Sequence, residues 1–295
     1  MRYSIVQIQA IVEVARCGFH VSKAARRLNT SQSVVSKHLK SFEDSFAAKI
    51  FLRSGKRLTG LTPEGEKIME HAERIIRDHN SIEKIGHEVS ANERESLSLV
   101  TTPTLARYLL AGTVKRFKQL HPRVQLHIQV EESDKAVDTL HHGICDFTVV
   151  PIGRLPTADL VVTHLTDWPR SLIGLPDCPL FDGRELTLHS IATQPVIAFE
   201  TPTISLQDTF DKHGIETDIA LTTSNPEVMK AYAELGLGIA IVATPTFDPV
   251  RDAPLRARDV SRIFPPVRIA ALQTNASYHI ALQSKFIEYL KASLR

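Results

Sequence analysis

A chain of 295 residues, of which 43% are hydrophobic, is long enough to form more than one packed domain. Its formal net charge of +2 says little about partners, and no apolar run has the length of a membrane-spanning helix. The three cysteines, Cys17, Cys145 and Cys178, lie far apart without a CxxC pair. They predict neither a disulfide framework nor a zinc ribbon and fit a reducing cytoplasm, although spacing alone leaves a redox-sensing pair open.

The N-terminal residues predict three helices. The first has an apolar face that indicates an amphipathic helix rather than a signal peptide: Ile5, Ile8, Ile11, Val12 and Ala15. Residues 20–40, HVSKAARRLNTSQSVVSKHLK, then predict a short helix, a tight turn at Asn29 and a second helix capped by Thr30 or Ser31. The apolar face of that second helix consists of four residues at helical spacing: Val34, Val35, Leu39 and Phe42.

Such a helix-turn-helix buries one side and presents amide, hydroxyl and amine groups to the major groove of DNA. The side chains of these helices that we expect to contact DNA are Ser22, Thr30, Ser31, Gln32, Ser33, Ser36, Lys37 and Lys40. Residues 49–62, KIFLRSGKRLTGLT, next predict the hairpin of a winged helix, in which Arg53, Lys56 and Arg57 contact the DNA backbone. Residues 20–60 carry nine basic and two acidic side chains, a local charge of +7 that indicates phosphate binding more than a merely solvated surface.

A long helix follows, with Thr62 as its N-cap, Pro63 at its first position and acidic residues in its first turn. Its apolar face extends to about residue 90: Ile68, Ile75, Ile76, Ile82, Ile85 and Val89. Because no domain of its own is evident for this face to cover, we expect it to pair with the same helix of a second subunit. The alternative is a helix that packs on its own domain.

From about residue 95 the pattern changes to alternating strands and helices, which predicts an α/β fold. The predicted strands are LSLVTT, VQLHIQVEE, CDFTVVP, PVIAFE, IALTT and IAIVA. The predicted helices between them are TLARYLLAGTVKRFKQLHP, DKAVDTLHHG, SLQDTFDKHG and PEVMKAYAELG. About 200 residues of this kind predict two small lobes with parallel or mixed sheets, and a ligand in the crevice between them at the carboxyl ends of the strands.

The segment 22–66, SKAARRLNTSQSVVSKHLKSFEDSFAAKIFLRSGKRLTGLTPEGE, resembles the DNA-binding domain of LysR-type transcriptional regulators. Further motifs resemble the CysB-like branch, which regulates sulfur assimilation: TTPTLARY at 101–108, HPRV at 121–124, CDF at 145–147 and YAELGLGIAIVA at 232–243. The resemblance covers the whole chain. It implies a winged helix-turn-helix at 1–60, a linker and dimerisation helix at 61–92, and a periplasmic-binding-protein-like effector domain at 93–295. In that domain lobe I would comprise about 93–165 and 268–295, and lobe II about 166–267.

The resemblance also implies a cytoplasmic homodimer or homotetramer that binds promoter DNA, acts with RNA polymerase and has no enzymatic activity. The implied effector is sulfate, thiosulfate or an acetylated serine, and no other cofactor is expected. The sequence itself places hydroxyl groups at three strand-to-helix junctions, where backbone N–H groups and the helix dipole favour an anion without a formal cation. The junction residues that we expect in this polar, uncharged cleft are Thr101, Thr102, Thr104, Thr201, Thr203 and Ser224.

Two positions depart from the CysB-like motif, in which TTHTQARY supplies the hydroxyls of Thr102 and Thr104 and a second-lobe threonine matches Thr201. Leu105 replaces the motif's glutamine, and Pro151 replaces a threonine after the third strand. These changes remove polar groups from the effector site and favour an apolar organosulfur compound or another carboxylate. The alternatives are threonines that only cap helices, a regulator of an unrelated pathway, a DNA-binding protein without a ligand, and a two-lobed solute-binding protein. His141 and His142 have no further ligands nearby, so no metal site is expected.

Overall fold

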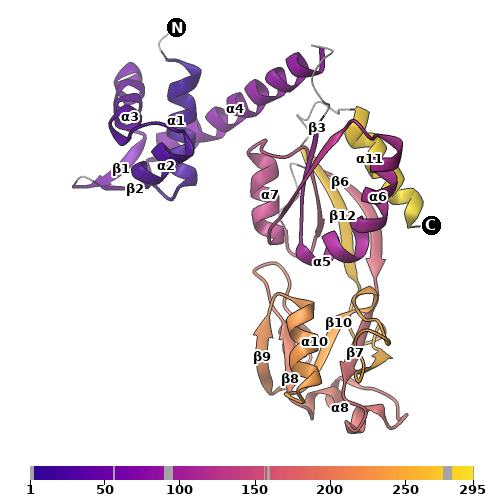
Figure 1. Cartoon of the computed structure of the whole chain (residues 1–295). Coiled ribbons are helices and arrows are strands. Elements are labelled where there is room, and N and C mark those ends of the chain that lie inside the picture. Colours follow the sequence, from indigo (N-terminus) through magenta and orange to yellow (C-terminus); the bar gives the residue numbers. More distant parts are fainter. Residues whose placement is uncertain are drawn as a thin grey trace. The chain divides into compact units, whose positions relative to one another are not determined.

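The structure, a computed structural model, describes residues 3–55, 57–89, 96–155, 157, 160–274 and 281–294. The chain divides into two compact units, Met1–Glu93 and Arg94–Arg295 (Figure 1). The first unit contains the helix-turn-helix, its hairpin and the long helix. The second unit consists of two α/β lobes.

Three helices of the first unit surround one apolar core. They are α1 (Ile5–Arg16), α2 (Val21–Arg27) and α3 (Gln32–Phe46). Ser4 caps α1, and Ser31 caps α3 by accepting a hydrogen bond from the backbone N–H of Val34. The antiparallel hairpin of β1 (Phe51–Ser54) and β2 (Arg57–Leu61) follows and is hereafter called the wing. The predicted winged helix-turn-helix is thus confirmed, except that Val34 is 39% exposed and does not belong to the buried face of α3.

The long helix α4 (Pro63–Val89) packs on its own unit over its first half. The hydroxyl of Thr62 accepts a hydrogen bond from the N–H of Gly65 at 2.9 Å and so caps the helix. Three residues along α4 are buried in the core formed by α1 to α3: Met69, Ala72 and Ile76. The expectation that α4 has no domain of its own to cover is therefore wrong for this half. Ile82, farther along, is 67% exposed, and the side chains of Ile85 and Val89 lie outside the described part of the structure.

The first lobe of the second unit contains a five-stranded mixed sheet in the order β4-β3-β5-β12-β6. Its strands are β3 (Ser96–Thr101), β4 (Gln125–Val130), β5 (Phe147–Pro151), β6 (Leu160–Trp168) and β12 (Val267–Thr274). On one face lie α5 (Pro103–Leu105), the π-helical turn Ala106–Leu110, α6 (Ala111–Leu120) and α11 (Ala281–Ser293). On the other face lies α7 (Ser133–His141), as Figure 1 shows.

The second lobe repeats this plan with a sheet in the order β11-β7-β10-β8-β9. Its strands are β7 (Arg170–Gly174), β8 (Val196–Phe199), β9 (Ile219–Thr223), β10 (Ile239–Ala243) and β11 (Arg256–Asp259). One face is covered by α8 (Leu188–Ala192) and α9 (Gln207–Asp211), and the other by α10 (Pro226–Glu234). The chain passes between the lobes twice, from β6 to β7 and from β11 to β12.

Two sequence-based expectations about the second unit need correction. The helix predicted at 205–214 is shorter, because α9 spans only Gln207–Asp211. No helix begins directly after Thr201–Thr203. Instead the hydroxyl of Thr201 accepts a hydrogen bond from the N–H of Ile204 at 3.0 Å and closes a turn. The pattern also did not reveal β6, β7, β11 and β12, which make the antiparallel pairings of both sheets.

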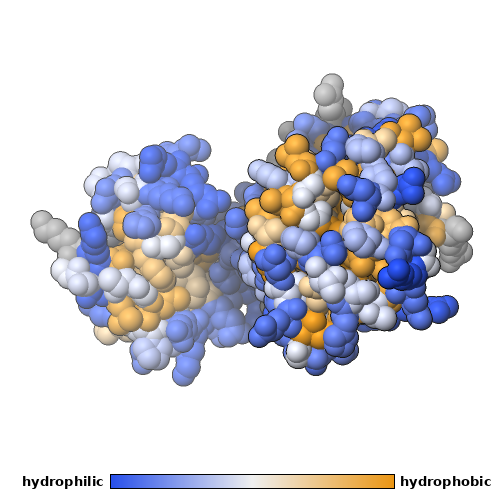
Figure 2. Space-filling view, turned by 90° about the horizontal axis from the view of Figure 1, so that it is seen from below, coloured by the Kyte–Doolittle hydropathy of each residue, from blue (hydrophilic) through white to orange (hydrophobic). Residues whose placement is uncertain are grey.

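Figure 2 shows a face on which hydrophilic residues are interspersed with smaller groups of apolar ones on both units. Within the ranges that the structure describes, no helix is both long enough and apolar enough to cross a membrane.

Candidate functional site

The residues predicted to contact DNA lie on the exposed surface of the first unit. All of them that the structure describes are exposed: Ser22, Thr30, Ser31, Gln32, Ser33, Ser36, Lys37, Lys40, Arg53 and Arg57. Lys56 lies outside the described residues. Ser31 and Ser33 share a 2.8 Å hydrogen bond at the N-terminal end of α3, where the first turn of the helix still has free N–H groups. The surface of α3 can therefore donate and accept hydrogen bonds as base edges and phosphates require.

A buried carboxylate joins α3 to the wing. Glu43 is 2% exposed and accepts hydrogen bonds from the backbone N–H groups of Ile50 (2.9 Å) and Phe51 (3.2 Å). The guanidinium of Arg53 donates to its other oxygen at 3.0 Å. Burial alone would raise the pKa of Glu43, but the two N–H donors and Arg53 outweigh it, so the pKa is lowered. Arg53, predicted as a phosphate contact, therefore also positions the wing against α3.

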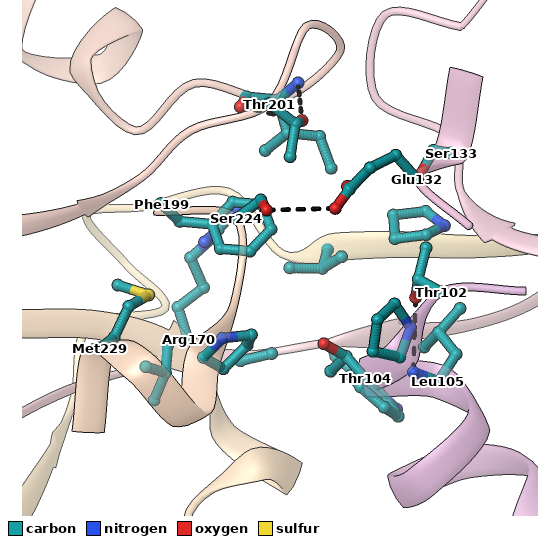
Figure 3. Close-up of a pocket in the computed structure, with 18 of the residues that line it drawn as sticks. Thr102, Thr104, Leu105, Glu132, Ser133, Arg170, Phe199, Thr201, Ser224 and Met229 are labelled. Carbon is teal, nitrogen blue, oxygen red and sulfur yellow. Dashed lines mark hydrogen bonds between the residues drawn. The ribbon is translucent and has the colours of Figure 1, made fainter. Parts of the chain in front are cut away.

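In the second unit a cavity lies between the two lobes, where the carboxyl ends of the parallel strands in both sheets meet (Figure 3). From the first lobe, β3, β4 and β5 lead into Thr102, Glu132 and Pro151. From the second lobe, β8 and β9 lead toward Thr201 and Ser224. The cavity is small, about 60 Å³, so it accommodates a few water molecules or a ligand of few heavy atoms.

The structure brings together six of the eight residues predicted for the effector site, which line this cavity: Thr102, Thr104, Leu105, Pro151, Thr201 and Ser224. The other two do not line it. Thr101 is fully buried and donates a hydrogen bond to the carbonyl of Val149 at 2.6 Å, so its hydroxyl joins two strands. Thr203 lines a separate hollow next to this cavity. The hydroxyl of Thr102 accepts a hydrogen bond from the N–H of Leu105 at 3.4 Å and therefore caps a helix as well.

The expectation of an uncharged cleft is wrong, because Arg170 and Glu132 also line the cavity. The guanidinium of Arg170 donates from Nε to the carbonyl of Pro265 at 3.0 Å. Burial lowers the pKa of Arg170 to about 10, which leaves it charged at neutral pH. The carboxylate of Glu132 accepts a hydrogen bond from the hydroxyl of Ser224 at 3.1 Å, and this bond joins the two lobes. The sequence contained one signal for Glu132: it follows β4 as Thr102 follows β3, and parallel strands end at the same edge.

Apolar groups form most of the cavity wall. They come from both lobes and include Leu105, Trp168, Phe199, Met229 and Val267. Such a wall excludes water and strengthens the interaction of a ligand with the few polar groups present. Arg170 also borders the neighbouring hollow, together with Pro151, Ile204 and Val267, so its side chain lies in the partition between the two spaces.

Beside the cavity a network of charged groups links the π-helical turn of the first lobe to α10 of the second. Tyr108 donates a 2.5 Å hydrogen bond to the carboxylate of Glu227, which also pairs with Arg107 at 3.2 Å. Lys230, which is 6% exposed, donates to Asp252 at 3.0 Å and to Tyr108 at 3.2 Å. Burial would lower the pKa of Lys230, but its bonds to Asp252, Tyr108 and Glu227 raise it, so the ammonium stays charged. Sequence reasoning missed this network, because its members from the two lobes lie more than a hundred residues apart in the chain.

Among the residues that the structure describes, no group of three or more histidines, cysteines or carboxylates could hold a metal ion. Cys17 and Cys145 are buried and Cys178 is half-buried, and none forms a disulfide. Burial raises the pKa of the Cys17 thiol, which makes this sulfur a poor nucleophile at neutral pH.

Both units match known protein families. Residues 5–66 match the family described as bacterial regulatory helix-turn-helix protein, lysR family. Residues 90–295 match the family described as LysR substrate binding domain.

The chain is also similar over most of its length to named regulators. It is 31% identical to the HTH-type transcriptional regulator SsuR of Burkholderia cenocepacia, covering 88% of this chain and 85% of that protein. It is 30% identical to the HTH-type transcriptional regulator CysB of Haemophilus influenzae, covering 98% of this chain and 90% of that protein. The solved cofactor-binding domain of the Cbl transcriptional regulator matches with a TM-score of 0.63 at 28% identity, covering 69% of this chain and 91% of that one. A full-length variant of OxyR from Pseudomonas aeruginosa shares the fold, with a TM-score of 0.69 at 21% identity, covering 100% of this chain and 95% of that one.

Proposed function

Because the chain belongs to the LysR family of bacterial transcriptional regulators, we propose that it controls genes of sulfur assimilation or organosulfur use. The members of this family are DNA-binding regulators, so the alternative of a two-lobed solute-binding protein is wrong. The sulfur role is supported by relatives named SsuR and CysB, at 31% and 30% identity, and by the CysB-like motifs in the chain. The observation that supports the proposal is the cavity where the strand ends meet, which is lined by six of the eight residues predicted for the effector site.

In this proposal α3 contacts the bases of the operator and the wing contacts the DNA backbone. Gln32 and Ser33 contact base edges, while Lys37, Lys40, Arg57 and Lys56 contact phosphates. Two subunits pair through α4 and further contacts build a tetramer, as the family resemblance implies. A longer operator is then read as two half-sites, and the bound protein acts with RNA polymerase at the promoter.

The proposed effector is a small molecule of sulfur metabolism that carries an anionic group, such as sulfate, thiosulfate or an acetylated serine. It lies in the cavity against the hydroxyls of Thr102 and Thr104 and the guanidinium of Arg170. A ligand held between two lobes favours the arrangement in which both lobes contact it. The apolar Leu105 and Pro151 favour a ligand that carries an apolar group beside its anionic one.

Thermal unfolding of the full chain tests the proposal. A ligand that binds only the folded protein stabilises it by RT ln(1 + [L]/Kd), so sulfate, thiosulfate, O-acetylserine and N-acetylserine are compared at equal concentration. We expect at least one to raise the melting temperature, and Thr102→Val to remove the shift. Thr222→Val, an exposed strand residue outside the cavity lining, is the matched control and should keep the shift.

DNA selection then tests the target genes. Genomic fragments captured by the purified protein, with and without the stabilising ligand, should lie upstream of sulfur genes. Fragments from an unrelated pathway, together with stabilisation by carboxylates alone, would favour the second candidate: a LysR-type regulator with a different carboxylate effector. The apolar cavity wall is the observation that supports this candidate. Absence of any ligand effect would leave a DNA-binding protein without a sensor.

A further inference from the structure

We propose that the cavity binds a small zwitterion, whose ammonium group pairs with Glu132 and whose acid group pairs with Arg170. The inference rests on the proposed function, because it takes this cavity as the effector site. It goes further by assigning two opposite charges to the ligand. Among the effectors considered above, O-acetylserine carries both charges at neutral pH, whereas sulfate and thiosulfate carry negative charge alone.

Glu132 supplies the negative charge of the site. It is half-buried at the junction between β4 and α7, and Figure 3 shows it facing Ser224 across the cavity. The hydroxyl of Ser224 is the one hydrogen-bond donor to this carboxylate within the described part of the chain, and no cation of that part pairs with it. A carboxylate that is partly removed from water and lacks a counter-ion is a favourable partner for an ammonium group.

Arg170 supplies the positive charge. A guanidinium has five N–H donors, and among the described residues only Nε has a hydrogen-bond partner, the carbonyl of Pro265. Across the described residues no carboxylate forms an ion pair with Arg170. Its planar pair of Nη groups matches the oxygens of a carboxylate or a sulfonate. The depressed pKa of Arg170 has burial as its cause, which agrees with a cation that gains from an incoming anion.

The two charges line one cavity without pairing with each other, and apolar side chains such as Leu105 and Phe199 form the wall around them. A ligand with an acid group alone would satisfy Arg170 but bring a second negative charge near Glu132. In an apolar surrounding this repulsion is poorly screened. A ligand that carries both groups neutralises both side chains, and the small volume of the cavity favours a short spacer between them.

Four matched probes test this inference on the full chain: 2-aminoethanesulfonate, 2-hydroxyethanesulfonate, 3-aminopropanoate and 3-hydroxypropanoate. Each amino compound differs from its hydroxy partner by one positive charge at nearly constant size. Trp168, the one tryptophan of the chain, lines the cavity, so its fluorescence reports the titrations. We expect at least one amino compound to bind at least about tenfold more tightly than its hydroxy partner, as a charge-assisted hydrogen bond allows.

Two variants assign the preference to Glu132. Glu132→Gln keeps the size of the side chain and its acceptor for Ser224 but should reduce the preference to about threefold or less. Glu131→Gln removes the same charge from the preceding residue, which does not line the cavity, and should keep the preference. Arg170→Gln should weaken the binding of the amino and hydroxy compounds alike. Urea unfolding followed by the fluorescence of Trp168, which lies in the second unit, shows that each variant is folded there.

The outcomes separate this inference from the proposed function. Equal affinities within both pairs, or a preference that survives Glu132→Gln, would overturn the zwitterion. Binding of sulfate or thiosulfate without any of the four probes would also overturn it and leave the sulfur role standing. A Glu132-dependent preference seen only with the carboxylate pair would support the zwitterion and contradict the sulfur role.

Discussion

The phenol of Tyr108 in the first lobe donates a 2.5 Å hydrogen bond to the carboxylate of Glu227 in the second lobe. Burial raises the pKa of Tyr108, and the bond to Glu227 raises it further, so the phenol remains a protonated donor throughout the neutral range. Tyr108 belongs to the π-helical turn that follows the cavity residues Thr104 and Leu105. A ligand that moves this turn must therefore also act on the contact between the lobes.

Removing the phenol hydroxyl should weaken the contact between the lobes. Tyr108→Phe leaves the carboxylate of Glu227 with fewer donors and should destabilise the second unit by about 1.5–3 kcal/mol, the range for a hydrogen bond to a charged group. Urea unfolding followed by the fluorescence of Trp168 measures this, since the only tryptophan lies in that unit. Tyr232→Phe, at a tyrosine of α10 that is 42% exposed, should change little. Equal stability of both variants would contradict a role for the inter-lobe bond.

The stability of the first unit should depend on the charge of Glu43. Its pKa is lower in the folded protein than its ordinary value of 4.5, so the carboxylate stabilises the fold at pH values above 4.5. That contribution is lost as the pH falls below 4.5 through the folded pKa. Glu43→Gln should lower the free energy of unfolding by about 1–3 kcal/mol at neutral pH and flatten its decline in acid, measured by circular dichroism. Asp44→Asn, at the exposed neighbour, should keep the wild-type pH profile.

Base discrimination should depend on the amide of Gln32, which is exposed at the first position of α3. Gln32→Ala should cost about 1–3 kcal/mol of binding to the preferred operator while leaving binding to random DNA nearly unchanged. Competition between operator and random duplexes at fixed salt measures the ratio. Gln129→Ala, at an exposed glutamine of β4, serves as the control. An unchanged ratio for Gln32→Ala would remove this residue from the contact surface.

Arg57 of the wing should act on all DNA sequences equally. Arg57→Ala removes one phosphate contact, so affinity should fall for operator and random DNA alike. The slope of log K against log salt should decrease in magnitude by about one. Arg262→Ala removes the same charge from an exposed position of the second unit and separates a local contact from a change in net charge. Identical salt slopes for the two variants would mean that Arg57 of the wing does not contact the DNA.

Self-association should depend on Ile82, which is 67% exposed on α4 beyond the part of the helix that packs on its own unit. Ile82→Asp places a charge where a helix pair would bury an apolar side chain, and should shift the protein toward monomers in sedimentation experiments. Val250→Asp alters an aliphatic residue that is 84% exposed in the second unit and should leave the distribution unchanged. A wild-type distribution for Ile82→Asp would contradict pairing through this part of α4.

The first unit was predictable because its determinants are local. Helical spacing, the caps Ser31 and Thr62 and the Ser-Gly turn of the wing all lie within a few residues of the elements they define. The packing of the first half of α4 against its own unit was not predictable in this way. Burial of Met69 and Ile76 depends on the position of α1 in space, and α1 lies more than fifty residues earlier in the chain.

The cavity was predictable in part for the same reason. The hydroxyls of Thr102 and Ser224 follow strands that are visible in the sequence, and parallel strands end at one edge. Arg170 begins β7, an antiparallel strand whose partners β10 and β11 lie about seventy residues or more away, so the pattern gave no reason to place it in a binding cavity. At Thr201 the hydroxyl accepts a hydrogen bond that closes a turn. In the sequence, a threonine that closes a turn looks the same as a threonine that caps a helix, so the turn was not predicted.

The carboxylate of Glu43 accepts three hydrogen bonds from Ile50, Phe51 and Arg53. These bonds connect α3 and the wing into one rigid DNA-binding surface. In such a rigid surface the distance between α3, which contacts the major groove, and the wing, which contacts the DNA backbone, cannot change. Each half-site must then present major groove and flanking phosphates at the spacing that the protein imposes. We expect the DNA to supply the adjustment, so that base pairs the protein never touches influence affinity through the ease with which they bend.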